Sequence, residues 1–190
     1  MTLDGTRLRH ARWNPATTRR GTVVLLQGRA DMIEKYFEVV EELRHRGFAV
    51  ATIDWRGQGG SERKLPDARK GHIWNFDEYQ NDLEVMIREV VLPDCPPPIF
   101  ALAHSMGSAI LLEAIRQGKR WFDRVVLSAP LIGLSRLRSG GFAQQSSYFA
   151  TMLGMGRMYV PGGGPLPRAS RPFLGNLLTS DPVRYERTAS

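Results

Sequence analysis

A serine lies where a buried apolar run meets an amphipathic one. Residues 99–115, IFALAHSMGSAILLEAI, have the pattern of a strand, a short turn and a helix. The small residues Ala103 and Gly107 permit a cramped turn that directs the hydroxyl of Ser105 out above the sheet. The start of the following helix favours a developing negative charge beside it. The pattern is typical of a nucleophile elbow, and it predicts that Ser105 is a nucleophile.

A serine nucleophile needs a base, and the histidines are placed unfavourably for that role. The chain has four histidines, all of which precede Ser105, namely His10, His45, His72 and His104. The turn should aim His104 away from Ser105. His72 lies in a loop that could approach the site, but we do not expect it to be the base, because a base must reach hydrogen-bond distance of the hydroxyl. Neither Asp123, at a strand entrance, nor Asp181, at the start of an Asp-Pro turn, is a convincing acid. We therefore expect the base and its acid to lie outside these 190 residues.

Strand and helix patterns alternate around the serine. Strands are expected at Thr22–Gln27, Phe48–Ile53, Ile99–Ala103 and Val125–Ser128, with a weaker edge strand at Arg7–Trp13. Helices are expected at Met32–Arg46, Asn75–Val91 and Met106–Gln117. Asp31 is predicted to cap the first helix, and Asn75 with Glu78 the second. This order predicts an α/β fold with a mostly parallel sheet flanked by helices.

The composition changes after Pro130. Residues 133–190 are rich in glycine, proline, serine and arginine, with one helix expected around Phe149–Met158. They carry seven arginines against two carboxylates, which suits contact with an anionic membrane surface. The sequence has no recognisable recognition helix and no platform of aromatic and basic residues, so we expect no nucleic-acid partner. We interpret residues 1–132 as a core and residues 133–190 as an incomplete cap.

The remaining composition narrows the class of protein further. No apolar run reaches the length of a membrane span, and the N-terminal residues lack a secretory pattern, so we expect a cytoplasmic protein, at most peripheral to the inner membrane. The single cysteine, Cys95, excludes an internal disulfide and is expected to be a loop residue rather than a nucleophile. We expect no metal and no cofactor.

Three blocks resemble one family of α/β-hydrolases, the monoacylglycerol lipase and lysophospholipase L2 type (serine aminopeptidase S33-like). They are LLQGRADMIEKYFEVVEEL at 25–43, DWRGQGGSER at 54–63 and LAHSMGSAI at 102–110. The resemblance implies that Ser105 is the nucleophile and that the backbone N–H groups of Arg29 and Met106 form the oxyanion hole. Gln27 and Gln58 stand at positions where histidine is common in the family, and the loop that begins at Asp54 is expected to be structural.

The resemblance also implies an activity. It suggests a hydrolase that cleaves lysophospholipid or monoacylglycerol-like esters through an acyl-enzyme, with the acid and histidine of the triad following the cap. The chain would then be truncated at its C-terminus. Two alternatives remain open: a serine aminopeptidase-type hydrolase, and an inactive fragment or binding module that lacks the histidine.

Overall fold

The computed structural model describes the whole chain except residues 3, 134–147, 160–172, 174–179 and 190. The chain divides into two compact units. One comprises Met1–Pro66 and Gly71–Gly133, and the other comprises Asp67–Lys70 and Leu134–Ser190. Each is described by itself below.

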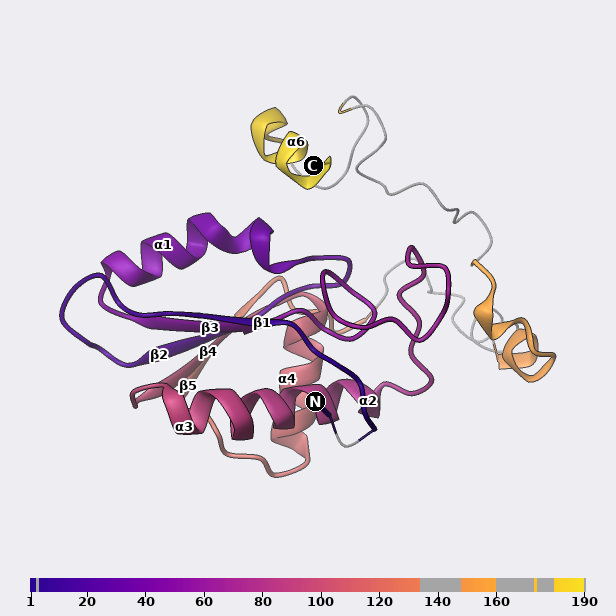
Figure 1. The fold of residues 1–190 in the computed structure, drawn as a ribbon, viewed down its shortest axis with the longest axis horizontal. Helices are drawn as coiled ribbons and strands as arrows, with labels where there is room; N and C mark the ends of the chain where they lie inside the picture. The colour runs from indigo at the N-terminus through magenta and orange to yellow at the C-terminus, as the bar shows by residue number, and fades with distance from the viewer. Residues whose placement is uncertain (3, 134–147, 160–172, 174–179, 190) are drawn as a thin grey trace. The chain divides into compact units, whose positions relative to one another are not determined.

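The first unit is built on a sheet of five strands (Figure 1). The strands are β1 His10–Trp13, β2 Thr22–Leu26, β3 Ala49–Ile53, β4 Ile99–His104 and β5 Arg124–Ser128. Their order across the sheet is β1-β3-β2-β4-β5, with β1 antiparallel to β3 and the other pairs parallel. The carboxyl ends of β2, β3, β4 and β5 therefore lie along one edge, where the sequence blocks that follow them meet.

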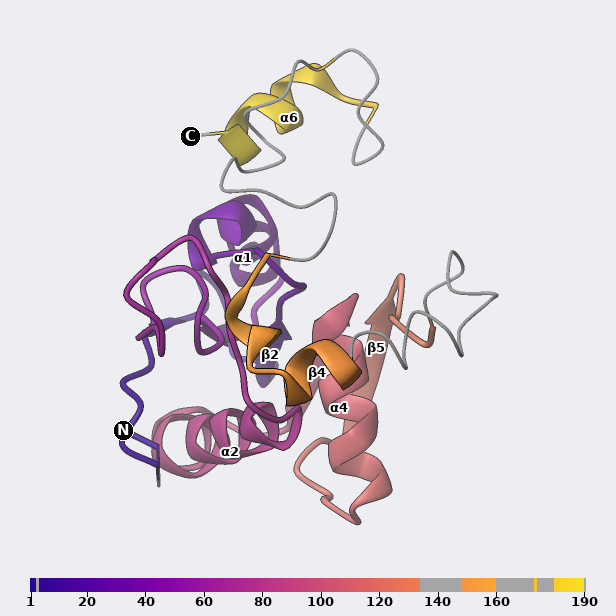
Figure 2. The ribbon, with the colours of Figure 1, turned by 90° about the vertical axis from the view of Figure 1, so that its right-hand side faces the viewer.

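Helices cover both faces of this sheet, as Figures 1 and 2 show. Helix α1 lies on one face, and α2 and α4 lie on the other. The helical segments are η1 Ile33–Tyr36, α1 Phe37–His45, α2 Asp77–Met86, the π-helical η2 Ile87–Val91, α3 Leu92–Asp94 and α4 Met106–Arg116. The expected α/β architecture is confirmed.

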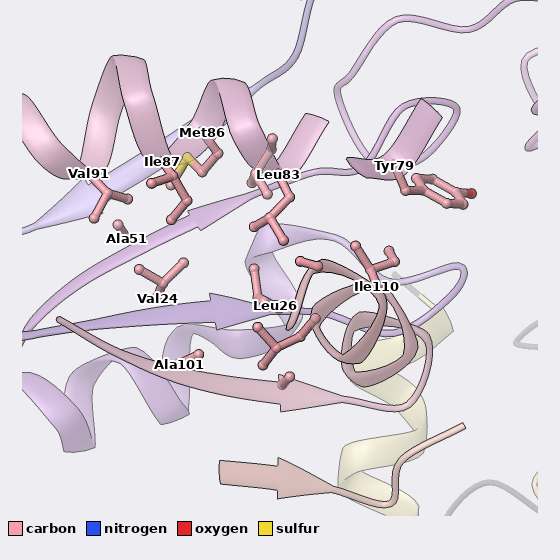
Figure 3. Close-up of a cluster of buried hydrophobic side chains, with 14 of the residues drawn as sticks. Val24, Leu26, Ala51, Tyr79, Leu83, Met86, Ile87, Val91, Ala101 and Ile110 are labelled. Carbon is pink, nitrogen blue, oxygen red and sulfur yellow. The ribbon is translucent and has the colours of Figure 1, made fainter. Parts of the chain in front are cut away.

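The core follows from strands that are apolar on both faces. All five residues of β2 are buried, as in a parallel strand covered by helices on each side. The larger cluster packs strand residues against α2, η2 and α4, and includes Val24, Leu26, Ala51, Ala101, Leu83, Met86, Ile87 and Ile110 (Figure 3). The smaller cluster, on the opposite face, packs Leu25 and Val50 against Val40 of α1.

The two helix caps differ from expectation. Asp31 does not cap a helix; its carboxylate instead accepts hydrogen bonds from Lys35 Nζ at 3.3 Å and Tyr36 Oη at 2.9 Å. The Asn75 Oδ1 accepts a hydrogen bond from the Asp77 N–H at 3.1 Å, but Glu78 does not complete the capping box. It pairs with Arg56 at 3.0 Å, because that buried cation needs carboxylates around it.

The sheet is open at β5 in the part of the chain that the structure describes. Val125 and Val126 are 39% and 59% exposed, and no described strand pairs with the outer side of β5. Cys95 is buried, and burial raises the pKa of its thiol, which suits a packing residue rather than a nucleophile. No helix among the described residues is long and apolar enough to cross a membrane.

The second unit contains short helices. Residues 148–152 are helical and are followed by the 3₁₀ turn η4 Met155–Arg157, within the helix expected around Phe149–Met158. Helix α6, Pro182–Ala189, was not expected. Its signal was present, since Asp181 Oδ1 accepts a hydrogen bond from the Val183 N–H at 2.9 Å and Pro182 occupies the first helical position. The expected turn at Asp181 is therefore a helix start.

Candidate active site

Ser105 forms a strained turn between β4 and α4. Its backbone has φ 48° and ψ −114°, a combination that a residue with a Cβ adopts only when its surroundings impose it. Its N–H donates to the carbonyl of Ser128 on β5 at 3.1 Å. Its carbonyl accepts from the N–H groups of Ser108 and Leu131, at 3.1 and 3.2 Å. The turn is thus fastened to β5, to α4 and to the segment after β5.

Gly107 lets helix α4 begin against the end of β2. A Cβ on this glycine would overlap the carbonyl oxygen of Leu26 and would lie 2.6 Å from that of Gln27. Ala103, at the other side of the turn, is fully buried. The expectation that the turn needs a small residue is confirmed at Gly107, and the burial of Ala103 agrees with it.

The loop after β2 lies directly beside the serine. A Cβ on Gly28 would be 3.4 Å from the Ser105 Cβ and 3.2 Å from the His104 Cδ2. Arg29 and Ala30 follow and are exposed, and Ala30 has φ 60°. No described residue accepts a hydrogen bond from the Arg29 N–H. The Met106 N–H belongs to the first residue of α4, where no acceptor exists within the helix. Among the described residues, the N–H groups of Arg29 and Met106 are therefore both without an acceptor, one in the loop beside Ser105 and the other directly after it in the chain.

The side chain of Gln58 holds this loop. Its Oε1 accepts a hydrogen bond from the Ala30 N–H, one residue after Arg29, and Gln58 itself is 7% exposed. Gln27 plays a parallel part, since its Nε2 donates to the Ile53 carbonyl at 2.5 Å and its carbonyl accepts from Trp55 Nε1 at 3.0 Å. Both glutamines thus tie the end of β2 to the end of β3.

The carboxylate of Asp54 also holds the loops after β2 and β3 together. It is fully buried, and its Oδ1 accepts from the Ile33 N–H at 2.9 Å while its Oδ2 accepts from the Gly60 N–H at 2.8 Å. Arg9 Nε also donates to it, at 2.5 Å. One carboxylate therefore joins the residue before β1, the segment after β2 and the loop after β3, which supports the structural role expected for that loop.

We predict that the Gln58 contact orders the loop locally. Replacing Gln58 by leucine removes the acceptor and should lower the free energy of unfolding by about 1 kcal/mol, since water can still reach the exposed Ala30. Amide hydrogen exchange at Ala30 should accelerate while exchange in β4 is unchanged. Gln58→Glu keeps an acceptor oxygen and should restore protection. Unchanged exchange at Ala30 in the leucine variant would show that Gln58 does not hold the loop.

None of the four histidines serves Ser105 among the described residues. His10 begins β1, and His45 ends α1, where it pairs with Glu41 at 3.1 Å. The ring of His72 packs edge-on against Trp74 at 4.6 Å. His104 lies beside Gly28 but forms no hydrogen bond with Ser105. The prediction that these histidines do not act as the base agrees with these contacts.

The role of these glutamines was missed by sequence reasoning. Gln27, Gln58 and Asp54 were visible in two motifs, but which backbone groups they bind depends on how β2 and β3 pair. A surface groove of about 330 Å³ also escaped notice; it lies over α4 and is lined by Phe76, Asp77, Ala109, Leu112, Glu113, Arg116, Leu131 and Ile132. Ser105 does not line it, so the chemistry is assigned to the turn and its flanking loop.

A parallel sheet with a strained serine at the carboxyl edge defines the class of protein as an α/β-hydrolase. The chain superposes on the monoacylglycerol lipase of Paleococcus ferrophilus with a TM-score of 0.61 and 23% identity, over 77% of this chain and 52% of that one. It superposes on a soluble variant of the monoglyceride lipase of Saccharomyces cerevisiae with a TM-score of 0.63 and 24% identity, over 80% of this chain and 50% of that one. These likenesses show the fold.

Sequence comparison shows the family. The family model described as serine aminopeptidase, S33, matches residues 17–189. Lysophospholipase L2 of Escherichia coli K12 is 35% identical over 166 residues, which is 87% of this chain and 48% of that protein. The monoglyceride lipase of Rattus norvegicus is 27% identical over 70% of this chain and 42% of its own length. The chain belongs to the serine aminopeptidase S33 family, and it spans about half the length of these relatives.

Proposed function

We propose that the protein carrying this chain is a serine hydrolase that cleaves lysophospholipid or monoacylglycerol-like esters. The observation that carries the proposal is the strained conformation of Ser105 at the carboxyl edge of the sheet, beside a loop with a free N–H. The relatives that are named as a lysophospholipase and as monoglyceride lipases support this substrate class.

In the proposed mechanism, Ser105 Oγ attacks the ester carbonyl carbon while its proton passes to a histidine. The N–H groups of Arg29 and Met106 donate to the carbonyl oxygen as it becomes negative. Collapse of the tetrahedral intermediate breaks the ester C–O bond, and the histidine returns the proton to the departing alcohol. Water then attacks the acyl-enzyme, which releases the fatty acid and restores the serine.

The base and its acid are proposed to come from outside these 190 residues. Two observations support this: His10, His45, His72 and His104 make no hydrogen bond to Ser105, and the relatives are about twice as long as this chain. No metal or cofactor takes part in the proposed steps. Residues 133–190 are proposed to form part of the cap.

A fluorophosphonate probe tests the nucleophile. The protein expressed from its complete gene should be labelled at Ser105, as mapped by mass spectrometry, and its Ser105→Ala variant should not be labelled. The 190-residue chain alone should turn over esters slower by orders of magnitude, because the proposed general base lies outside it. Ser108→Ala is the matched control, since that hydroxyl donates to the Ala103 carbonyl at 2.8 Å and is buried. Equal labelling of wild type and Ser105→Ala would refute the assignment.

Contact with an anionic membrane surface is proposed for the second unit, at the cytoplasmic face. Several apolar side chains there are more than half exposed, namely Tyr148, Phe149, Met152, Leu153 and Met158. Sedimentation with phosphatidylglycerol vesicles should capture the protein at low salt, and replacing Phe149 and Leu153 by serine should reduce capture. Equal recovery with and without vesicles would exclude such contact.

A further inference from the structure

Arg29 has no ion-pair partner among the residues that the structure describes. Its backbone belongs to the loop beside Ser105, and its side chain is exposed. Its side chain forms no hydrogen bond or ion pair with any described residue. A guanidinium at the mouth of a candidate active site is therefore available to a ligand.

The surrounding carboxylates are already bound to other cations. Asp31 pairs with Lys35 at 3.3 Å, within the same segment. Glu34 pairs with Arg9 at 2.6 Å, and Arg9 also donates to the buried Asp54. The two carboxylates nearest to Arg29 in the chain, Asp31 and Glu34, are therefore each paired with another cation.

The charge of Arg29 acts on Tyr79 of α2. Burial raises the pKa of Tyr79 on α2, and the positive charge of Arg29 opposes that shift, so the two groups are electrostatic neighbours. Tyr79 is 5% exposed and stacks edge-on against Phe76 and Trp55.

We propose that Arg29 is a specificity-determining residue that binds the phosphate of an acylated glycerol phosphate, a deduction that rests on the proposed ester hydrolysis at Ser105. Arginine binds phosphate through paired N–H donors, which suits this role better than a lysine would. The glycerol bridge between the ester and the phosphate of a lysophospholipid is similar in length to the aliphatic part of an arginine side chain. A residue whose N–H binds the oxyanion can therefore place its guanidinium at the phosphate of the same molecule.

The inference predicts a preference among esters that share one acyl chain. A phosphorylated ester gains the contact with Arg29, whereas a neutral monoacylglycerol does not. The attraction should weaken as salt is added, because the site is open to solvent.

The test compares hydrolysis of 1-hexanoyl-glycerol 3-phosphate with that of 1-monohexanoylglycerol by the protein expressed from its complete gene. Arg29→Gln keeps the backbone N–H and removes the guanidinium and its charge. Because the Arg29 N–H also belongs to the proposed oxyanion hole, the readout is the ratio of kcat/KM for the phosphorylated ester to kcat/KM for the neutral ester, which should fall about tenfold, mainly through the KM of the phosphorylated ester. Arg29→Lys should fall between wild type and Arg29→Gln.

Arg19→Gln is the matched control. Arg19 is exposed and precedes β2, whereas Arg29 follows its end, so the same charge is removed at the opposite edge of the sheet. It should leave both esters unaffected. An equal loss for both esters in Arg29→Gln, or no loss for either, would overturn the role of Arg29 alone. If wild type cleaves neither ester while Ser105 remains unlabelled, the proposed function fails instead, and the inference falls with it.

Free glycerol 3-phosphate, added as a competitor, separates a lipid headgroup from a free phosphate. It should inhibit hydrolysis at least about tenfold more weakly than the phosphorylated ester binds, since it lacks the acyl chain. Inhibition as tight as the KM of the ester would mean that Arg29 holds a free phosphate, and would overturn its assignment as a headgroup contact.

Discussion

Replacing Arg56 by methionine is expected to lower the free energy of unfolding by about 3–5 kcal/mol. The side chain of Arg56 is fully buried, and its guanidinium donates to Asp82 at 2.6 and 2.8 Å. It also bonds Asp4 at 2.7 Å and lies 3.0 Å from Glu78. Methionine fills similar space, so the loss of stability reports the missing charge rather than a cavity. Asp82, which is also fully buried, would keep its carboxylate without a cation beside it.

The pH dependence identifies the cause of this loss. Burial raises the pKa of Asp82, and the hydrogen bonds from Arg56 oppose that shift. Without Arg56 the folded-state pKa rises further above the unfolded value. The folded state then binds more protons, so stability is present at low pH and is lost as pH rises through the folded-state pKa. Chemical denaturation should show the difference between wild type and variant shrinking as pH falls, and a constant difference would point to packing instead.

Two further variants complete the experiment. Asp82→Leu added to Arg56→Met removes the unpaired carboxylate and should recover much of the lost stability. Arg46→Met is the exposed control, because Arg46 bonds Glu42 at 2.8 Å with both side chains more than half exposed. It should change stability by less than about 1 kcal/mol. A similar loss at positions 46 and 56 would contradict the buried-charge explanation.

The sheet and its order of elements were predictable because each element carries its own periodicity. The strand at Thr22–Leu26 is a continuous β-branched and apolar run, and α4 shows its stripe within eleven residues. The elbow was predictable for the same reason, since strand, turn and helix are contiguous. Such local patterns do not depend on which parts of the chain meet later.

Contacts between distant segments were not predictable. The Gln58 amide meets the Ala30 N–H across 28 positions, and Arg56 meets Asp82 across 26. A charged residue in a glycine-rich loop gives no sign that it will be fully buried. Glu78 shows the consequence, since it fits a capping box by sequence yet bonds to Arg56 in the fold.

The predicted start of the first helix, at Met32, was wrong for a related reason. The apolar spacing continues through Ile33, but the first turn is a 3₁₀ helix, with Phe37 the first α-helical residue. The Ile33 N–H donates to Asp54 at 2.9 Å, so tertiary contact with the loop after β3 decides how this segment enters the helix.

Gly107→Ala is expected to lower the free energy of unfolding by about 3 kcal/mol or more. The added Cβ would overlap the Leu26 carbonyl and lie 2.6 Å from that of Gln27, and backbone cannot move aside as a flexible side chain can. The start of α4 would have to shift away from β2, which moves Ser105 relative to the loop at Gly28. Thermal unfolding by circular dichroism measures the loss, and fluorophosphonate labelling of Ser105 should slow in the fraction that remains folded.

Gly133→Ala is the matched control for that substitution, because a Cβ there meets no atom of the described residues within 4 Å and stability should change by less than about 0.5 kcal/mol. The contrast isolates the close approach of α4 to β2 from the general cost or benefit of removing a glycine. If Gly107→Ala were as stable as Gly133→Ala, helix and strand would have room to separate, and the strained turn at Ser105 would not depend on their contact.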